Sequence, residues 1–318
     1  MKFEKAAVIG TGMMGPGIAV TFALGGLSAR LISRTAEKAD AGIETARRLI
    51  AYLEQHGLID SSAAASAGEK IAPTSNMSEA AAWADIVVES APENMEFKQG
   101  LFAELDSAAR PETVLASNTS GLSITAIGSR CRHPERVLTT HFWNPPHLMP
   151  LVEVVKGEKT RDDCAMGVRD LLARCGKLAV IVKKDTPGQL GNRMQVAMIR
   201  EAINIVAEGI ADPADVDLAA KAGFGLRLPV YGIFEHQDLI GLEMGHSIVD
   251  YVSKGLYNEP RAPQLMQDLI DRGDLGVKTG RGFYDWSKRD PEAVKELRDR
   301  WLREFLKTPF AKEQRAKG

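Results

Sequence analysis

The sequence predicts an α/β protein in which a doubly wound, mostly parallel sheet comes first and a second, mostly α-helical domain follows. Three observations predict this fold class. Short apolar runs alternate with longer amphipathic segments up to about residue 185, a glycine-rich turn follows the first apolar run, and the alternation stops after Gly188. Such alternation is typical of parallel sheets that are covered by helices on both faces.

Seven segments are predicted as strands because they are short and, in the early ones, continuously apolar. They are Ala6–Gly10, Ala29–Ser33, Asp85–Ser90, Thr113–Asn118, Val137–Trp143, Leu151–Lys156 and Ala179–Lys183. The amphipathic segments between them are predicted as helices, which makes βαβ units. The Ala- and Ser-rich segment Ser61–Gly68 is predicted as a flexible loop.

The turn Asp185–Gly188 is the predicted domain boundary, so the first domain covers residues 1–187 and the second covers residues 188–318. Beyond it, Met194–Gly209 and Pro213–Ala222 have apolar residues at helical spacing. A last helix is predicted to begin at Asp290 and Pro291, a good cap and first-turn pair. Its apolar stripe packs either on its own domain or on a partner subunit, and consists of Val294, Leu297, Trp301 and Phe305.

Composition and charge exclude several classes of function. The formal net charge is −2, and the basic residues are spread along the chain, so no footprint for nucleic acid or an anionic membrane is present. The 3 cysteines have no metal-type or redox-type spacing. No apolar run approaches the roughly 18 residues that span a bilayer, and no signal-peptide pattern is present at the N-terminus. We expect a cytoplasmic protein without a metal.

A G-x-G-x-x-G pattern ends the first predicted strand and opens the first helix. Gly10 permits the tight turn, Gly12 lets the backbone approach a pyrophosphate, and Gly15 permits close packing of helix on strand. The pattern alone is a weak signal, but at this junction it predicts a Rossmann-type dinucleotide site that includes Met13 and Met14. The alternative is a glycine-rich turn with no ligand.

The end of the second strand bears on the choice of cofactor. NAD-binding folds usually place an acidic residue here for the ribose 2′-hydroxyl, whereas this chain has Ser33 and Arg34. A serine can donate to a 2′-phosphate, and an arginine can pair with it bidentately. The cofactor is therefore NAD or NADP, with NADP favoured; the alternative is that Arg34 only stacks on the adenine of NAD.

A base–orienter pair is predicted from two polar residues in neighbouring apolar strands. His141 suits the removal of an alcohol proton near neutral pH. Glu153 lies in the next apolar run, where an unpaired carboxylate is costly. The turn at Asn144–Pro146 lets the two strands run back along each other, so that Glu153 accepts a hydrogen bond from the imidazole. The alternative is two satisfied polar residues in a core.

A polar cluster, Ser117–Ser120, closes the strand before His141. It lies at the carboxyl end of a sheet strand, where open α/β sheets bind ligands. Asn118 is expected to address the nicotinamide and Ser120 the substrate hydroxyl. The same residues also suit a turn and a helix cap, which is the alternative.

Together these motifs resemble the L-3-hydroxyacyl-CoA dehydrogenase family over nearly the whole chain. The matching pieces are Gly10–Gly15, Pro92–Asn94 with Lys98, Ser117–Ser120, His141 with Asn144 and Pro145, Leu151–Val155, Asp185–Gly188 with Asn192 and Arg193, and Lys278–Tyr284. The resemblance implies an NAD(P)-dependent dehydrogenase that transfers a hydride between a nicotinamide and the 3-hydroxyl of a 3-hydroxyacyl-CoA or a free 3-hydroxy acid.

The resemblance also implies roles for individual residues. His141 would be the general base and Glu153 its orienting partner, while Ser120 and Asn192 would donate to the substrate. The residues that it implies near the cofactor are Glu93, Lys98 and Asn118. It further implies a homodimer built through the helical domain.

One departure bears on the substrate. The Asn144–His147 segment has two prolines, where the thioester enzymes usually have one. In this it is more similar to relatives that act on free acids: gulonate, carnitine and pyridine-carboxylate dehydrogenases. Thioester and free acid both stay open. The second proline stiffens the loop, and His147 is a candidate contact for the acid group.

Two other hypotheses for the function compete with the hydroxyacyl-CoA dehydrogenase interpretation. The first is a dehydrogenase of the 6-phosphogluconate and hydroxyisobutyrate group, whose lysine and Gly-rich strand are not evident here. The second is a non-catalytic, crystallin-like or ligand-binding protein on the same scaffold, against which the intact set of candidate catalytic residues argues.

Overall fold

The computed structural model describes residues 1–317. The strands form one eight-stranded sheet in the order β3-β2-β1-β4-β5-β6-β7-β8, in which every neighbouring pair is parallel except β6 and β7. The strands are β1 Lys5–Ile9, β2 Ser28–Ile32, β3 Ile71–Thr74, β4 Ile86–Glu89, β5 Val114–Ser117, β6 Val137–Phe142, β7 Leu151–Lys156 and β8 Leu178–Val182. This confirms the predicted doubly wound sheet.

The edge strand β3 is the strand that the sequence analysis missed. It has only four residues, of which Ile71 alone is buried, and it contains Pro73. Proline cannot donate to a sheet ladder and is therefore confined to edge strands or bulges. A short edge strand with one buried residue leaves no apolar run for a pattern to detect.

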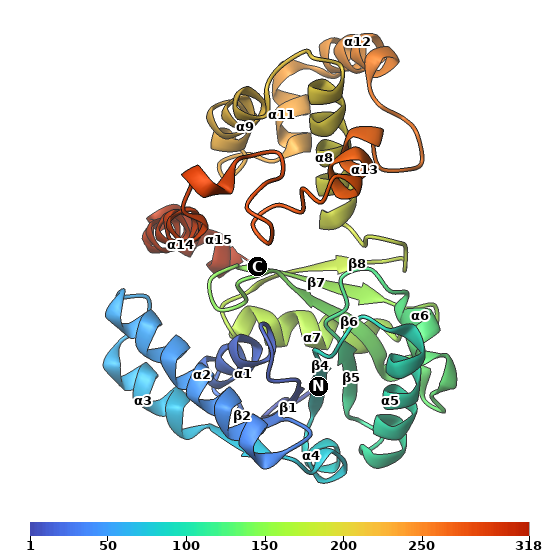
Figure 1. The fold of residues 1–318 in the computed structure, drawn as a ribbon. Coiled ribbons are helices and arrows are strands. Elements are labelled where there is room, and N and C mark those ends of the chain that lie inside the picture. Colours follow the sequence, from blue (N-terminus) through green and yellow to red (C-terminus); the bar gives the residue numbers. More distant parts are fainter. Residues whose placement is uncertain (318) are drawn as a thin grey trace. The chain divides into compact units, whose positions relative to one another are not determined.

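In the first unit, helices cover both faces of the sheet (Figure 1). The α-helices of the described chain are α1 Gly15–Leu24, α2 Ala36–Gln55, α3 Ser61–Glu69, α4 Met77–Trp83, α5 Met95–Ala108, α6 Ile124–Ile127, α7 Asp162–Arg174, α8 Gly191–Ala207, α9 Pro213–Ala222, α10 Phe224–Arg227, α11 Ile233–Ile240, α12 Leu242–Val252, α13 Gln264–Asp271, α14 Pro291–Lys307 and α15 Pro309–Lys317.

Helix α3 corrects the flexible loop that was predicted for Ser61–Gly68. The Asp60 carboxylate accepts a hydrogen bond from the backbone N–H of Ala63 at 2.8 Å, which caps the helix start. Ala64 and Ala67 are buried against the sheet core. The small residues of this segment therefore form the packed face of a helix and not a flexible linker.

Successive residues of the inner strands face two different cores. On β1, Ala6 and Val8 belong to the core under α1, α2, α3 and α7, whereas Ala7 and Ile9 belong to the core under α4, α5 and α6. Because side chains alternate along a strand, both faces of this strand must be apolar. This accounts for the continuous apolar runs in the sequence.

The chain divides into two compact units. The first unit contains residues 1–192 and 297–318, and the second contains residues 193–296. The predicted domains, 1–187 and 188–318, stay a prediction. The compact units differ from them because residues 297–318 belong to the first unit. Leu306 of α14 is buried in the core of the first unit. No helix in the described part of the chain is long and apolar enough to span a membrane.

The last helix does not use the whole apolar stripe to pack. Leu302, Phe305 and Leu306 contact the core of the first unit. The stripe residues nearer the start of the helix, Leu297 and Trp301, are 57% and 59% exposed. Phe305 is thus the stripe residue that packs within the chain.

Candidate active site

The glycine-rich loop lies at the carboxyl end of β1 and leads into α1. Gly10 has φ +107°, a left-handed conformation that favours glycine. A Cβ on Gly15 would lie 1.8 Å from the Gly10 carbonyl oxygen, so only glycine fits there. A Cβ on Gly12 would meet no atom within 4 Å, and Met13 beside it is 79% exposed. The loop therefore leaves open space at a helix N-terminus, which fits a pyrophosphate.

Ser33 and Arg34 follow β2, next to this loop. The Ser33 and Thr11 hydroxyls lie 3.2 Å apart, which joins the end of β2 to the glycine-rich turn. Arg34 is exposed, and no residue in the described part of the chain forms an ion pair with it. Its guanidinium is therefore available to an anionic or aromatic group that binds at the end of β2.

His141 and Glu153 are directly opposite each other on the antiparallel strands β6 and β7. Directly opposed residues project from the same face of a sheet, so the pairing brings the two side chains together. Nδ1 of His141 lies 3.2 Å from Oε1 of Glu153. The imidazole is 7% exposed and the carboxylate is 0% exposed.

Glu153 accepts three more hydrogen bonds. The Trp143 indole donates to Oε1 at 3.0 Å, and the backbone N–H groups of Leu190 and Gly191 donate to Oε2 at 2.9 and 3.1 Å. Burial by itself raises the pKa of a carboxyl group, but the hydrogen bonds from His141, Gly191, Leu190 and Trp143 outweigh it. The pKa of Glu153 therefore lies below its ordinary value, and the carboxylate is charged.

The loop that carries Ser120 is fixed by its backbone. Glu93 Oε1 accepts from the Thr119 hydroxyl at 2.6 Å and from the Ser120 N–H at 2.8 Å. The Asn192 amide donates to the Ser120 carbonyl oxygen at 3.0 Å. The Ser120 hydroxyl makes no hydrogen bond to any described residue, and the residue is exposed. The loop thus presents a free hydroxyl.

Lys98 lies beneath this loop in a buried ion pair. Its ammonium is 2.6 Å from Oε1 of Glu89 and 3.3 Å from Oε2 of Glu93, and the side chain is 1% exposed. Burial raises the pKa of Glu93, but hydrogen bonds from Thr119, Ser120 and Lys98 bring it below the ordinary value. Glu93 and Lys98 therefore support the Ser120 loop, and their predicted place beside the cofactor stays a prediction.

Asn118 joins three strand ends. Its side-chain oxygen accepts from the Phe142 N–H at 2.9 Å, and its amide donates to the Ser90 hydroxyl at 3.4 Å. Since these contacts occupy both ends of the amide, Asn118 holds the carboxyl ends of β4, β5 and β6 in register. Its predicted contact with nicotinamide stays a prediction.

His147 does not join the polar cluster around His141. Its ring packs edge-on against Tyr52 of α2, with centroids 5.7 Å apart, and its buried Nδ1 has no hydrogen-bond partner. It lines a cavity of about 260 Å³ with Lys177 and Leu306. Burial, together with the charge of Lys177, lowers the pKa of His147 to about 4. The sequence analysis expected His147 to contact the acid group of the substrate. In the structure its ring instead packs against Tyr52 of helix α2.

Two site residues escaped the sequence analysis. Trp143 is two residues after His141, and alternation along an extended chain puts both on one side, so this signal was present. Gln189, whose amide donates to the Thr119 carbonyl oxygen at 2.9 Å, gave no signal. Its position depends on a left-handed backbone conformation that no pattern of residue types reveals.

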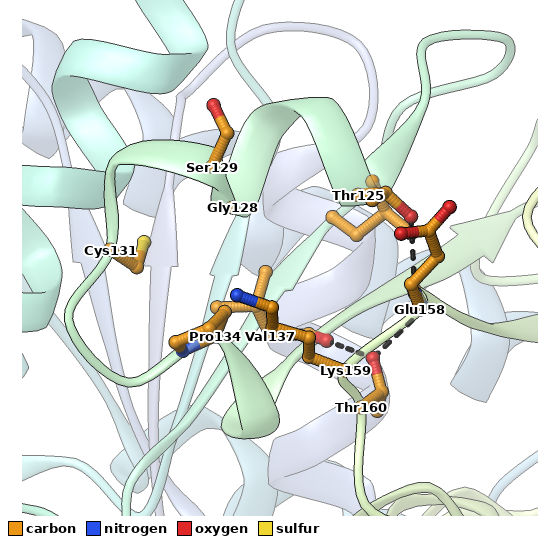
Figure 2. A pocket seen from close by; sticks show the side chains of 11 residues that line it. Thr125, Gly128, Ser129, Cys131, Pro134, Val137, Glu158, Lys159 and Thr160 are labelled. Carbon is orange, nitrogen blue, oxygen red and sulfur yellow. Dashed lines mark hydrogen bonds between the residues drawn. The ribbon is translucent and has the colours of Figure 1, made fainter.

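Another cavity, also of about 260 Å³, lies at the other end of β6 (Figure 2). Val137 begins β6 and lies four positions before His141, which is about 13 Å along a strand. The Thr160 hydroxyl donates to the Val137 carbonyl oxygen and accepts from the Gly157 N–H, and Glu158 N–H donates to Thr125. The cavity lies at the opposite end of β6 from the His141–Glu153 pair. Among the described residues no cluster of His, Cys, Asp and Glu is arranged to hold a metal ion.

A Rossmann-type sheet with a glycine-rich loop after β1 and a histidine–carboxylate pair near the carboxyl end of β6 is typical of a nicotinamide-dependent dehydrogenase. The NAD-binding domain model of 3-hydroxyacyl-CoA dehydrogenase matches residues 5–186, and its C-terminal domain model matches residues 188–286. The chain belongs to the 3-hydroxyacyl-CoA dehydrogenase family. It is a dehydrogenase that acts on a CH–OH group, and its first domain binds NAD(H).

Two relatives and one solved structure extend the comparison. The chain is 34% identical to 5-formyl-3-hydroxy-2-methylpyridine 4-carboxylate 5-dehydrogenase of Mesorhizobium japonicum, over 94% of this chain and 96% of that protein. It is 38% identical to a probable 3-hydroxybutyryl-CoA dehydrogenase of Bacillus subtilis, over 91% and 99%. A crystal structure of the pyridine-carboxylate enzyme, described as an NAD⁺-dependent dismutase, superposes with a TM-score of 0.87 at 30% identity, over 96% of this chain and 97% of that one.

Proposed function

We propose that the protein oxidises a 3-hydroxy group, or reduces the corresponding carbonyl, with His141 as the general base and Glu153 as the group that orients it. The observation that supports this most strongly is the buried carboxylate of Glu153. It is 3.2 Å from His141 and is held from its other sides by an indole and two backbone N–H groups. These contacts fix the orientation of the carboxylate, so that its Oε1 faces Nδ1 of His141.

The tautomer of His141 follows from this contact. An ionised carboxylate only accepts hydrogen bonds, so Nδ1 of His141 must carry the hydrogen. Nε2 then has a free lone pair and takes the proton of the substrate hydroxyl. The electron pair of the C–H bond leaves as hydride, the carbonyl forms, and Glu153 stabilises the imidazolium. The nicotinamide supplies the hydride acceptor.

Ser120 and Asn192 stay the predicted donors to the substrate, and in the structure the Asn192 amide donates to the Ser120 carbonyl oxygen. The Ser120 hydroxyl is free to donate to the substrate oxygen, and its loop is held by Glu93 and by the Asn192 amide. A donor beside the reacting oxygen stabilises the charge that develops there. The relatives do not favour the non-catalytic and the 6-phosphogluconate-type alternatives, because they are named as a probable 3-hydroxybutyryl-CoA dehydrogenase and an L-carnitine dehydrogenase.

A free carboxylic acid is our proposed substrate class, in preference to an acyl-CoA. The chain superposes on the pyridine-carboxylate dehydrogenase structure with a TM-score of 0.87, against 0.76 for a solved 3-hydroxybutyryl-CoA dehydrogenase. The second proline of the Asn144–His147 segment supports the same choice. The test is kcat/KM for 3-hydroxybutyryl-CoA, 3-hydroxybutyrate and the named pyridine carboxylate. A higher value for a free acid supports the proposal, and a higher value for the thioester contradicts it.

NADP is proposed as an accepted cofactor because Ser33 and the unpaired Arg34 close the end of β2, where no acidic residue is present. The relatives favour NAD, since the matched domain model and the solved relative are both described with NAD. Titration of tryptophan fluorescence with NADH and NADPH decides between them. Tighter binding of NADPH, lost in Arg34→Gln, supports a 2′-phosphate site; tighter binding of NADH, unchanged in that variant, contradicts it.

A cytoplasmic homodimer built through the helical part of the chain completes the proposal. Helix α8 exposes several large apolar side chains, and exposed apolar surface of this kind is typical of subunit interfaces. They are Met194, Val196, Met198 and Ile199. Light scattering of the purified protein tests this: the mass of a dimer supports it and the mass of a monomer contradicts it.

A further inference from the structure

Gln189 adopts an unusual backbone conformation beside the proposed site. Its φ is +54°, and it is the only residue other than glycine with a positive φ in the described part of the chain. Left-handed backbone is unfavourable for residues with a Cβ, and Gln lacks the short side chain that helps Asn and Asp to adopt it. Such strain persists where the surrounding contacts determine it, and it gathers at functional sites.

The side chain explains what holds this conformation. Gln189 is 4% exposed, and its Nε2 donates to the Thr119 carbonyl oxygen at 2.9 Å. A carbonyl can only accept, so the amide nitrogen must face it and the assignment of the amide is fixed. Oε1 of Gln189 is buried with no hydrogen-bond partner. A buried amide left half satisfied is costly, which argues against a role in stability alone.

The contact joins two loops that carry different parts of the site. On one side, Thr119 is followed by Ser120, whose N–H is held by Glu93 and whose carbonyl is held by Asn192. Gln189 holds the preceding carbonyl, so three side chains fix the two peptide groups that flank Ser120. This restricts where the Ser120 hydroxyl can point.

On the other side, the residues that follow Gln189 hold the catalytic carboxylate. The N–H groups of Leu190 and Gly191 donate to Oε2 of Glu153. A Cβ on Gly191 would lie 2.5 Å from the Trp143 ring and 3.0 Å from Oε1 of Glu153, so the turn is closely fitted there. The left-handed turn at Gln189 directs these two donors.

We propose that Gln189 is a positioning residue that fixes the Ser120 hydroxyl relative to the His141–Glu153 pair by clamping the turn before α8 to the Thr119 carbonyl. This inference rests on the proposed function, because it assigns Gln189 a role in the reaction of that site. Gln189 acts through Ser120 and is not itself expected to touch the reacting atoms.

Two substitutions separate the clamp from the backbone strain. Gln189→Met keeps the size of the side chain and the strain but removes the clamp. Gln189→Gly removes both, since glycine adopts positive φ freely. We expect kcat/KM to fall about 10- to 100-fold in both, the loss expected when a reacting group is misplaced by about 1 Å. The thermal midpoint is measured for both variants, because both remove the buried hydrogen bond to the Thr119 carbonyl.

A matched control exists elsewhere in the first unit. Gln99 of α5 also donates from its side-chain amide to a backbone carbonyl, that of Ala126, at 2.9 Å. Gln99→Met removes a comparable clamp from a helix outside the site. We expect its kcat/KM to match that of the wild type, so any general effect of losing such a contact will be visible.

The decisive measurement is a double-mutant cycle between Gln189→Gly and Ser120→Ala. If Gln189 acts through Ser120, Gln189→Gly will cost little further activity in the Ser120→Ala background. Full additivity, or wild-type kinetics of both Gln189 variants, would overturn the inference. His141→Ala is assayed alongside: normal turnover there contradicts the proposed function itself, whereas its loss with unaffected Gln189 variants contradicts only this inference.

Discussion

His141 and His147 lie on either side of the Asn144–Pro146 turn, and both are largely removed from solvent, yet their surroundings differ completely. His141 faces a charged carboxylate that is itself held by an indole and two backbone N–H groups. His147 packs on Tyr52 with a buried, unpartnered Nδ1. Burial is therefore common to both rings, and only His141 has a fixed acceptor that sets its tautomer, which is why we propose His141 and not His147 as the base.

The electrostatic setting of the two rings differs in the same sense. Glu153 gives His141 a negative neighbour, which in the proposed reaction would stabilise the imidazolium. His147 has the positive charge of Lys177 nearby, and burial with this charge lowers its pKa to about 4. His147 therefore stays neutral at physiological pH, and its environment opposes the protonation that a general base must undergo.

Replacement of His141 should have the largest effect. We expect His141→Ala to lower kcat by about 10²–10⁴-fold, the range for loss of a general base. Cofactor affinity should stay unchanged, because the ring lies on β6 and the dinucleotide cradle on the β1–α1 loop. Steady-state kinetics and a cofactor titration measure both. Turnover within a few fold of the wild type would show that His141 is no more catalytic than His147.

Removal of the charge on Glu153 should have the next largest effect. In Glu153→Gln, an amide N–H pointing at His141 would move the hydrogen of the imidazole to Nε2, which removes the base. We expect kcat to fall by up to about 10⁴-fold, the loss found when an orienting carboxylate becomes an amide and the imidazole takes the wrong tautomer. The measurement is kcat across pH. An unchanged kcat would mean that the pair is a structural contact only.

His147→Phe should leave kcat unchanged and alter only the pH dependence of stability. In the wild type the unfolded histidine takes a proton near pH 6.5, and the folded one takes it only near pH 4. The unfolded state binds more protons in this window, so the free energy of unfolding falls by ~3 kcal/mol as pH drops through it. Phenylalanine keeps the ring on Tyr52 and lacks this titration.

Urea unfolding of the wild type and of His147→Phe at pH 7 and pH 4.5 measures this difference. The variant should lose less stability than the wild type between these two values. If both proteins lose the same free energy of unfolding, groups other than His147 cause the acid sensitivity. A large fall in kcat would instead restore His147 as a contact for the substrate.

Much of this fold and site could be predicted from the sequence, for physical reasons that individual residues show. Strands such as β1 face two cores and so have continuous apolar runs, whereas β3 has one buried residue and a proline and left no pattern. The pairing of His141 with Glu153 followed because a buried carboxylate needs a partner and a turn lay between them. The sequence did not predict that the His147 ring packs against Tyr52.

The supporting residues show the same limit. Trp143 could be placed with His141 by alternation along the strand, but the roles of Glu89 and Gln189 depend on contacts between distant segments. Glu89 is fully buried against Lys98, and Gln189 reaches Thr119 from a left-handed turn. Neither a buried ion pair nor a strained turn has a characteristic spacing, so both required the structure.

The most direct test of the central claim is ¹⁵N NMR of the histidine rings in the wild type and in Glu153→Gln. The chemical shift of each ring nitrogen distinguishes one that carries hydrogen from one with a free lone pair. The account predicts that neutral His141 carries its hydrogen on Nδ1 and has a bare Nε2, and that this preference is lost in Glu153→Gln. A hydrogen on Nε2 in the wild type would contradict it, because His141 could not then accept the proton of the substrate.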